Sequence, residues 1–228
     1  MRPYYEHGNI TIYNADCAEI LPRLMCCALV LTDPPYGIGQ AKGMGGGGFD
    51  GFGNRQHRQP RKYEGDWDVK PQPDLLRLAV TAGKHAIVWG GNYFTDVLPQ
   101  AERWLAWDKQ QTMPSYSDVE LAWTNLPGVA LKMFRFCGAG IFAVEQVRWH
   151  PTQKPVALMQ WCLCQIAACT GTVLDPFMGS GSTLVAAKLH GNAAIGIEIE
   201  EKYCEIAATR LAQEVLPFDE MQNLQTRF

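Results

Sequence analysis

The sequence contains no apolar run that approaches the roughly 18 residues of a membrane-spanning helix. Its N-terminal residues lack the basic region leading into an apolar region that marks a secretion signal. Eight cysteines are present, mostly within apolar runs, but no two of them form a Cys-x-x-Cys pair. We therefore expect reduced, buried cysteines in a cytoplasmic protein, in preference to disulfides or a metal site.

The chain also carries little net charge, −3 at pH 7. Any binding to nucleic acid must therefore come from a local basic surface rather than from the field of the whole molecule. Apolar residues are abundant: 47% of the 228 residues are hydrophobic, enough for one domain to bury roughly 70% of the surface that its unfolded chain exposes. We find no internal repeat and no dividing linker, and we expect a single domain.

A short apolar run, residues 27–31, leads into the tetrapeptide Asp33-Pro34-Pro35-Tyr36. The run reads as a buried strand, so the tetrapeptide lies where the chain leaves a sheet, which is where open α/β sheets place their ligands. The Asp33 carboxylate and the Pro34 carbonyl can accept hydrogen bonds from an exocyclic NH2 group, and Tyr36 can stack on a planar ring. The tetrapeptide therefore predicts a site for an amine-bearing ring; a turn that merely closes a strand is the alternative.

A second motif combines a strand at residues 171–174, a glycine-rich turn at 175–183 and a helix at about 182–189. These are the parts of a nucleotide-binding βα unit. The turn is not a P-loop, because no Lys precedes Ser182. It is not a dinucleotide fingerprint either, because Leu184 stands at the third glycine position. What remains is a turn that lets a small ligand approach the backbone, with Asp175 available to a cationic amino group.

Glu198 ends the next expected strand, residues 194–197, and follows Gly179 by nineteen positions. An acidic residue at that distance accepts hydrogen bonds from ribose hydroxyls in nucleotide-binding folds. The combination predicts an adenosyl ligand that carries an amino-acid group instead of phosphates. Lys154, between prolines and before a helix expected at 156–168, is a candidate contact for the carboxylate of that ligand.

The stretch from Gly37 to Gly65 is long, glycine-rich and without hydrophobic periodicity. Loops of this kind are functional lids or disordered segments. Five basic residues stand against Asp50 alone, a local excess of four positive charges that suits contact with DNA phosphates. These candidate DNA-binding residues are Lys42, Arg55, Arg58, Arg61 and Lys62. A solvated insertion without a role is the alternative.

Several smaller features complete the prediction. Asp16 follows a strand at 10–14 and is equally well explained as a helix N-cap or as a ligand contact. Two glycines, Gly90 and Gly91, end a strand at 85–89 and allow either close approach of a ligand or a tight turn. We also expect helices at 18–24 and 74–82 and strands at 103–107, 119–124 and 129–136, the last two as a hairpin. The tryptophans are expected in the core and groove walls.

With both motifs placed, the chain resembles the permuted, β-class amino-methyltransferases of DNA, in which the catalytic half precedes the half that binds S-adenosylmethionine. It looks most like the short versions carried by phages and prophages. The resemblance implies a Rossmann-like α/β fold, with a mostly parallel seven-stranded sheet, an antiparallel edge strand and helices on both faces. It also implies one domain over 1–228, made of a catalytic half (about 1–92), a small recognition insert (about 93–149) and a cofactor-binding half (about 150–213).

The resemblance further implies roles for individual residues. The catalytic residues are Asp33, Pro34, Pro35 and Tyr36. The residues at the methionine end of the cofactor include Lys154, Asp175, Phe177, Gly179, Gly181, Ser182 and Thr183, whereas Glu198 binds the ribose and Asp16, Cys17 and Ile199 border the adenine. The remaining cofactor contacts are Asp33, Thr152, Pro155, Pro176 and Ser180.

The implied activity is methyl transfer from S-adenosylmethionine to the N6 amine of adenine in double-stranded DNA, with the target base flipped and no metal required. Cytosine-N4 methylation presents the same amine geometry and is the nearest alternative. Asp33 favours adenine, because cytosine-specific relatives more often have Ser before Pro-Pro-Tyr. Glutamine methylation of a protein fits less well, because relatives with that activity have Asn there. A non-catalytic DNA-binding module is the alternative from another class, and a homodimer and a partner endonuclease remain open.

Overall fold

The computed structural model describes residues 2–38, 68–110, 117–137, 153–166 and 171–212. It also describes the backbone of two short strands, β4 (Gly48–Phe49) and β5 (Arg55–Gln56), which pair with each other in antiparallel fashion. The other strands are β1 (Tyr5–His7), β2 (Ile10–Asn14), β3 (Cys27–Thr32), β6 (Gly83–Trp89), β7 (Trp104–Asp108), β8 (Val119–Thr124), β9 (Lys132–Arg135), β10 (Val173–Asp175) and β11 (Ala194–Glu198). The helices are α1 (Cys17–Ile20), η1 (Leu21–Arg23), α2 (Pro73–Thr81), η3 (Gly91–Tyr93), α3 (Val156–Leu163), α4 (Ser182–Leu189) and α5 (Glu201–Ala212).

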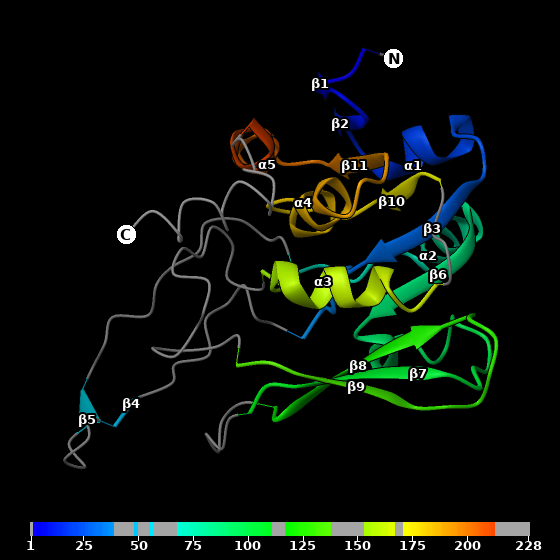
Figure 1. Ribbon diagram of the computed structural model, residues 1–228, viewed down its shortest axis with the longest axis vertical. Coiled ribbons are helices and arrows are strands. Elements are labelled where there is room, and N and C mark those ends of the chain that lie inside the picture. Colours follow the sequence, from blue (N-terminus) through cyan, green and yellow to red (C-terminus); the bar gives the residue numbers. More distant parts are fainter. Residues whose placement is uncertain are drawn as a thin grey trace, which may run out of the picture.

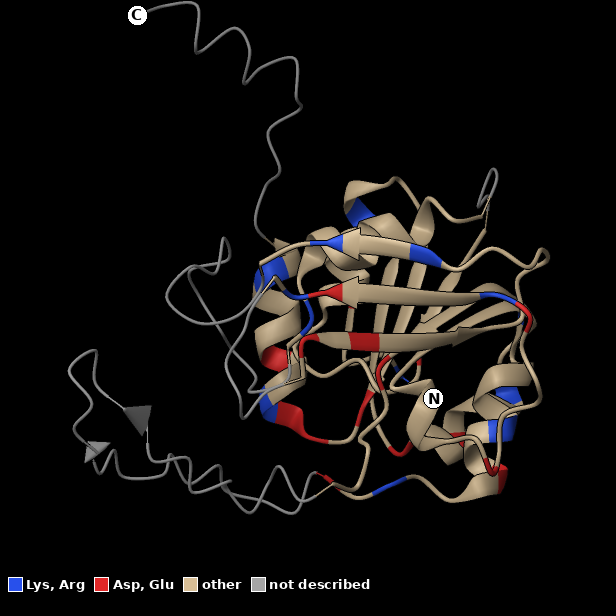
Figure 2. Ribbon diagram, turned by 90° about the horizontal axis from the view of Figure 1, so that it is seen from below, with Lys and Arg blue, Asp and Glu red and all other residues tan. Residues whose placement is uncertain are grey.

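Nine of these strands form one sheet in the order β1-β2-β11-β10-β3-β6-β8-β7-β9 (Figure 1). Five neighbouring strands of this sheet, β2, β11, β10, β3 and β6, run parallel to one another. β8 runs antiparallel to both β6 and β7, and β1 is an antiparallel strand at the other edge. Figure 2 shows β8, β7 and β9 side by side, with acidic and basic residues interspersed over the described part of the chain.

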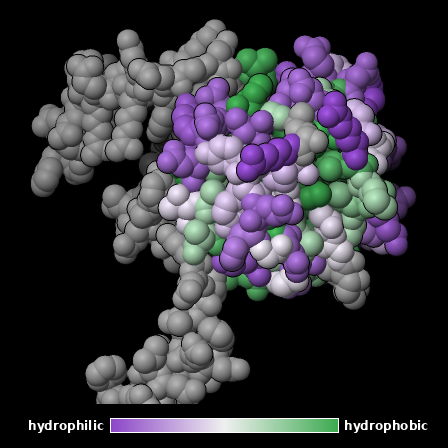
Figure 3. All heavy atoms as spheres, turned by 90° about the horizontal axis from the view of Figure 1, so that it is seen from above, coloured by the Kyte–Doolittle hydropathy of each residue, from purple (hydrophilic) through white to green (hydrophobic). Residues whose placement is uncertain are grey.

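Helices cover both faces of the sheet, and the central strands are buried from both sides. Along β3, Leu29 and Leu31 pack into the core under α3, α4 and α5, whereas Val30 packs into the core under α1 and α2. Strands covered on both faces read as continuous apolar runs, which is why residues 27–31 show no polar alternation. The face of the molecule seen in Figure 3 is mostly hydrophilic, with smaller apolar areas.

The fold class expected from the sequence is confirmed, although the sheet of the described residues has nine strands rather than seven. Helix α4 occupies the predicted range. It begins after Gly181, which has a φ of +80°, and ends before Gly191, whose φ of +78° suits glycine just past a helix. Helix α3 ends at Leu163, earlier than predicted. Helix α5 was not predicted, although its buried residues Tyr203, Ala207 and Leu211 recur every four positions.

The hairpin expected between residues 119–124 and 129–136 is wrong. β7 lies between the two strands, antiparallel to β8 and parallel to β9. The reason is that β8 already pairs with β6 on its other side, so β9 can join only at the free edge of β7. The Trp107 indole N–H fixes that arrangement by donating to the Phe136 carbonyl at 2.9 Å.

The tryptophans and cysteines follow the expectation in part. Trp89, Trp107 and Trp123 are buried, and so are the cysteines at 17, 27, 162 and 204, whereas Cys26 and Cys164 are exposed. No helix in the described part of the chain has the length and apolar character needed to cross a bilayer.

Candidate active site

A cavity of about 550 Å³ lies at the carboxyl ends of the parallel strands. Asp33 follows β3, Asp175 and Glu198 end β10 and β11, and Asp16 follows β2, so the topology brings these four carboxylates to one edge of the sheet. Most of the predicted site residues are among those that line the cavity: Asp16, Cys17, Asp33, Pro34, Pro35, Tyr36, Lys154, Asp175, Pro176, Phe177, Gly179, Ser180, Ser182, Thr183, Glu198 and Ile199. Other lining residues, such as Asp68 and Lys70, were not predicted. The catalytic tetrapeptide and the glycine turn therefore share one cavity.

Asp33 is held by two donors at one end of the cavity. The Tyr36 hydroxyl donates to Oδ1 of Asp33 at 2.5 Å, and the Lys154 ammonium donates to Oδ2 at 2.6 Å. The Asp33 side chain is 16% exposed. Burial raises the pKa of Asp33 above its ordinary value, because the nearby Lys154 charge offsets that effect only in part.

The ring of Tyr36 is placed by aromatic neighbours and by a glycine. It stacks on Tyr93, with ring centroids 4.8 Å apart, and meets the edge of Phe94. Gly90 has a φ of +67°, and a Cβ added there would overlap the Tyr36 ring. Gly90 and Gly91 thus allow close approach to Tyr36 and Trp123, and they form the tight turn that leads into η3.

Asp175 sits at the base of the glycine turn and is 3% exposed. The Thr32 hydroxyl donates to its Oδ1 at 2.7 Å, and the Phe177 N–H donates to the same oxygen at 3.2 Å. Burial raises the pKa of Asp175 to about 6, even though hydrogen bonds from Thr183 and Thr32 act to lower it. A carboxyl group in this state gains charge stabilisation from any cation that enters the cavity beside it.

The two glycines of the turn serve different purposes. Gly179 has a φ of +50° and open space where a Cβ would point, and it lines the cavity. A Cβ at Gly181 would instead lie 2.8 Å from Cβ of Ala207 on α5. Gly181 therefore allows close helix packing, and the structure places neither it nor Pro155 in the cavity lining.

Glu198 joins the glycine turn to the start of α5. Its Oε2 accepts the Gly179 N–H at 3.0 Å, and its Oε1 accepts the Glu200 N–H at 2.8 Å. Burial raises the pKa of Glu198, whereas these backbone donors act to lower it. Because a carboxylate has about four acceptor positions, both oxygens can still accept from hydroxyl groups of a ligand.

Asp16 combines the two roles between which the sequence could not decide. Its Oδ1 accepts the Ala18 N–H at 2.8 Å and so caps α1. Its side chain also lines the cavity beside Cys17. Burial raises the pKa of the Cys17 thiol to about 12, so this residue borders the cavity as a neutral thiol.

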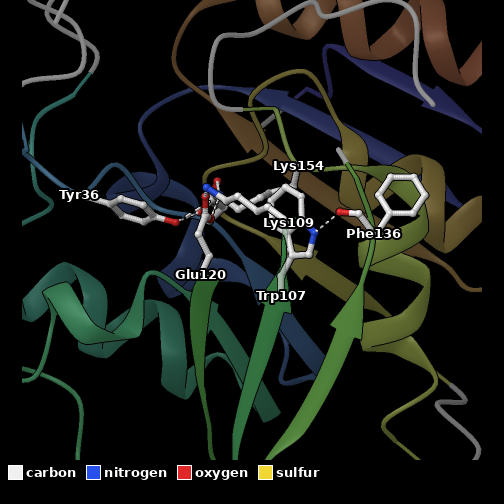
Figure 4. Close-up of polar contacts among 7 residues, drawn as sticks. Tyr36, Trp107, Lys109, Glu120, Phe136 and Lys154 are labelled. Atoms are coloured by element: carbon white, nitrogen blue, oxygen red, sulfur yellow. Dashed lines mark hydrogen bonds and ion pairs between the residues drawn. The ribbon is translucent and has the colours of Figure 1, made fainter. Parts of the chain in front are cut away.

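Two charged residues at the catalytic end were not predicted. Glu120, on β8, lies with its Oε2 3.1 Å from Nζ of Lys154 and its Oε1 2.5 Å from Nζ of Lys109 (Figure 4). Burial acts to raise the pKa of Glu120, but the two ammonium groups lower it below its ordinary value, so Glu120 is ionised at neutral pH. The sequence offers one signal: Glu120 is the single acidic residue in an otherwise apolar and hydroxyl-bearing strand.

Some predicted residues lie outside the described part of the chain. They are Thr152 and the basic residues Lys42, Arg58, Arg61 and Lys62, and of Arg55 only the backbone is described. Gln153, beside Thr152, was not predicted as a contact but lines the cavity and accepts a hydrogen bond from the Ser180 hydroxyl at 3.1 Å. No group of three or more potential metal-ligating side chains occurs among the described residues.

Comparison with known proteins agrees with this architecture. A family described as DNA methylase (N6_N4_Mtase) matches residues 99–209. The chain is 45% identical to the type II methyltransferase M2.DpnII of Streptococcus pneumoniae, over an alignment that covers 93% of each chain. The chain therefore belongs to the N6/N4 DNA methylase family and is a DNA methyltransferase.

Two solved structures show the same fold. The M1.HpyAVI–SAM complex superposes with a TM-score of 0.58 at 24% identity, covering 90% of this chain and 100% of that one. The cytosine-N4-specific PvuII DNA methyltransferase superposes with a TM-score of 0.63 at 16% identity, covering 99% of this chain and 94% of that one. These similarities support the Rossmann-like arrangement of sheet and helices.

Proposed function

We propose that this DNA methyltransferase transfers the methyl group of S-adenosylmethionine to the N6 amine of adenine in DNA. The observation that carries the proposal is the single cavity that joins the Asp33 tetrapeptide to the Asp175–Thr183 turn. One end of the cavity offers acceptors for an amine, and the other offers a backbone that a ligand can approach closely. A methyl donor and a flipped base can therefore meet inside it.

The residues of the glycine turn fit an adenosyl amino acid. Asp175 supplies an anionic group for an ammonium, Gly179 leaves open space over the backbone, and Glu198 has acceptor capacity for ribose hydroxyls. The half-buried Phe177 and the 66% exposed Ile199 supply apolar surface near Asp16 and Cys17. When bound, S-adenosylmethionine supplies an electrophilic methyl group on its sulfonium.

The tetrapeptide supplies the chemistry at the amine. An exocyclic NH2 is a poor nucleophile because its lone pair is delocalised into the ring. Acceptance of its hydrogens by Asp33 and by the Pro34 carbonyl favours a pyramidal nitrogen with a localised lone pair. Methyl transfer from bound S-adenosylmethionine would place positive charge on this nitrogen, and the Asp33 carboxylate would stabilise that charge. The nitrogen then loses one proton, which the Asp33 carboxylate or water can accept.

The base must leave the duplex to reach this depth. Tyr36 is a candidate surface for the flipped ring, although one face of its own ring already stacks on Tyr93. The basic residues between 42 and 62 remain the proposed contacts to DNA phosphates. A homodimer and a partner endonuclease remain predictions from the sequence.

The test is transfer of labelled methyl groups from S-adenosylmethionine to unmethylated genomic DNA by the purified chain. Digestion of the DNA to nucleosides should give N6-methyladenine, and single-molecule sequencing should give the site. N4-methylcytosine in its place would establish the cytosine alternative. If no label entered the DNA, the chain would be a DNA-binding module without catalytic activity.

The Asp33→Ala variant sharpens this test. It should lose at least about 1,000-fold in methyl transfer, because the amine loses its charged acceptor. It should keep its affinity for S-adenosylhomocysteine, since the glycine turn is untouched. Near-normal turnover by Asp33→Ala would refute the catalytic assignment whatever base is modified.

A further inference from the structure

Lys154 lies between two carboxylates that come from different parts of the chain. Its side chain is 5% exposed, and its ammonium is 2.6 Å from Oδ2 of Asp33 and 3.1 Å from Oε2 of Glu120. Asp33 follows a strand of the parallel core, whereas Glu120 stands on β8, in the region that was predicted as the recognition insert. Figure 4 shows Lys154 and Glu120 converging on the hydroxyl end of Tyr36.

The register of the sheet explains why Glu120 reaches this point. β8 is antiparallel to β6, and Ala122 stands opposite Trp89, the last residue of β6. Glu120 is two residues earlier on β8 and therefore lies just beyond the carboxyl end of β6, on the same face as Ala122. Lys109 follows β7 and bonds the other Glu120 oxygen, which fixes the direction of the carboxylate.

The geometry at Asp33 creates a conflict for the proposed reaction. Lys154 donates to Oδ2 and Tyr36 donates to Oδ1, so the incoming amine has to share these oxygens with two donors, one of them positively charged. A lysine ammonium bonded to Asp33 also opposes the positive charge that develops on the amine nitrogen. However, a buried ammonium cannot simply leave one carboxylate, because an unpaired buried charge is strongly unfavourable.

We propose that Glu120 is a positioning residue that acts as a second ion-pair partner for Lys154. The ammonium can then leave Oδ2 of Asp33 when the target amine arrives. The inference rests on the proposed function and extends it by assigning a role to a residue outside the catalytic and cofactor motifs. Glu120 already lies 3.1 Å from Nζ of Lys154, so the ammonium moves between two anionic partners without losing both. Glu120 also draws the Lys154 charge away from Asp33, which leaves the Asp33 carboxylate as the negative group that faces the amine.

The first test measures Asp33 itself in the protein without DNA or cofactor, and so does not depend on methyl transfer. Carboxyl groups of 13C-labelled aspartate are titrated by NMR, with Asp33 assigned from its missing signal in Asp33→Asn. The groups around Asp33 are Tyr36, Lys154, Glu120 and Asp175, with Lys109 behind Glu120. Glu120→Gln should lower the titration midpoint of Asp33, because a neighbouring negative charge is lost and Lys154 is left to Asp33 alone.

The matched control is Glu102→Gln, the same substitution at an exposed residue just before β7. It should leave the Asp33 midpoint unchanged. An Asp33 midpoint that does not move in Glu120→Gln would overturn the proposal, and it would do so even if the chain methylates adenine as proposed. Conversely, if the Asp33 midpoint shifts as expected but the protein never transfers labelled methyl groups to DNA, the proposed function is refuted and the Glu120–Lys154–Asp33 coupling stands.

The second test separates positioning from mere structural support. Glu120→Gln should lower kcat by at least about tenfold and leave the KM for S-adenosylmethionine and for DNA within about twofold. Glu120→Asp should recover part of the loss, since it restores the charge with a shorter reach. In a Lys154→Met background, the same Glu120→Gln change should alter kcat by less than about twofold. An equal loss with and without Lys154 would show that Glu120 acts by another route.

Discussion

The two ends of the cavity combine local and long-range contacts differently. At the glycine turn, backbone N–H groups two positions away donate to Asp175 and Glu198, and the Thr32 hydroxyl also reaches Asp175 across 143 positions. At the catalytic end, Tyr36 donates to Asp33 from three positions away, but the charged partner of Asp33, Lys154, lies 121 positions along the chain. The backbone contacts of the turn therefore come from its own motif, whereas the charges around the catalytic acid come from distant parts of the fold.

The largest effect expected is a loss of ligand affinity when a large side chain replaces a glycine of the turn. Gly179→Trp places a large side chain at a backbone φ of +50° and into the open space that lines the cavity. Affinity for S-adenosylhomocysteine should fall by about 100-fold or more, a loss of ~2.7 kcal/mol or above in binding free energy. Isothermal titration calorimetry of the purified variant measures it.

Gly128→Trp is the control for that substitution. Gly128 also has a positive φ, +97°, and open space around its Cβ position, but it lies outside the cavity lining. Its affinity for the same ligand should match that of the parent chain. Equal affinity in Gly179→Trp and Gly128→Trp would show that the turn is not the ligand site.

Much of the cofactor end could be predicted because its signals are local. The strand, the turn and the helix of residues 171–189 follow one another without interruption, and Glu198 ends the next strand. The motif did not reveal that its two glycines have different roles. Gly181 packs on Ala207 of α5, a helix that was not predicted, whereas Gly179 faces the cavity. Tertiary packing therefore adds to the requirement that the turn sets through the φ of +80° at Gly181.

The catalytic end was predicted only as far as the tetrapeptide. Glu120 could not be assigned to it, because its position depends on β8 running antiparallel beside β6. The expected hairpin would have paired β8 with β9 and left the partner of β6 unspecified. The cofactor contact of Lys154 stays a prediction, and the sequence did not reveal that this lysine also hydrogen-bonds to Asp33 and Tyr36 and forms an ion pair with Glu120. Pairings between distant strands carry no signal in the sequence of either strand.

A smaller effect probes the catalytic end through Gly90. In Gly90→Ala, the added methyl group overlaps the Tyr36 ring, at a backbone φ of +67° that L-residues disfavour. The ring should shift and weaken the hydrogen bond from the Tyr36 hydroxyl to Asp33. We expect methyl transfer to fall by about 10- to 30-fold, with affinity for S-adenosylhomocysteine unchanged.

Gly8→Ala separates the ring overlap from backbone strain. Gly8 has a comparable φ of +58°, but a Cβ there meets nothing within 4 Å. Both variants should lose about 1–2 kcal/mol of stability from the left-handed backbone, read as a lower melting temperature. Only Gly90→Ala should lose activity, and a similar loss of activity in Gly8→Ala would mean that strain alone accounts for it.

The smallest effect concerns the ionisation of Asp175. Its pKa is raised to about 6 by burial, so the carboxyl group changes charge just below neutral pH. An ammonium group of the ligand is attracted to the ionised form. Affinity for S-adenosylhomocysteine should therefore be nearly constant above pH 7 and should fall as pH drops through 6, by about tenfold per unit well below that point.

Thr32→Val removes the hydroxyl that donates to Oδ1 of Asp175 at 2.7 Å. Because that hydrogen bond favours the ionised carboxyl group, its loss should raise the pKa of Asp175 further and move the midpoint of the affinity profile to higher pH. At pH 6.5 the variant should bind a few-fold more weakly than the parent, whereas at pH 8 the two should agree. Thr81→Val, which removes a hydroxyl bonded within α2, should leave the profile unchanged. Glu198 also has a raised pKa, so Asp175→Asn decides the assignment: a profile that still bends near pH 6 in this variant would place the titrating group at Glu198.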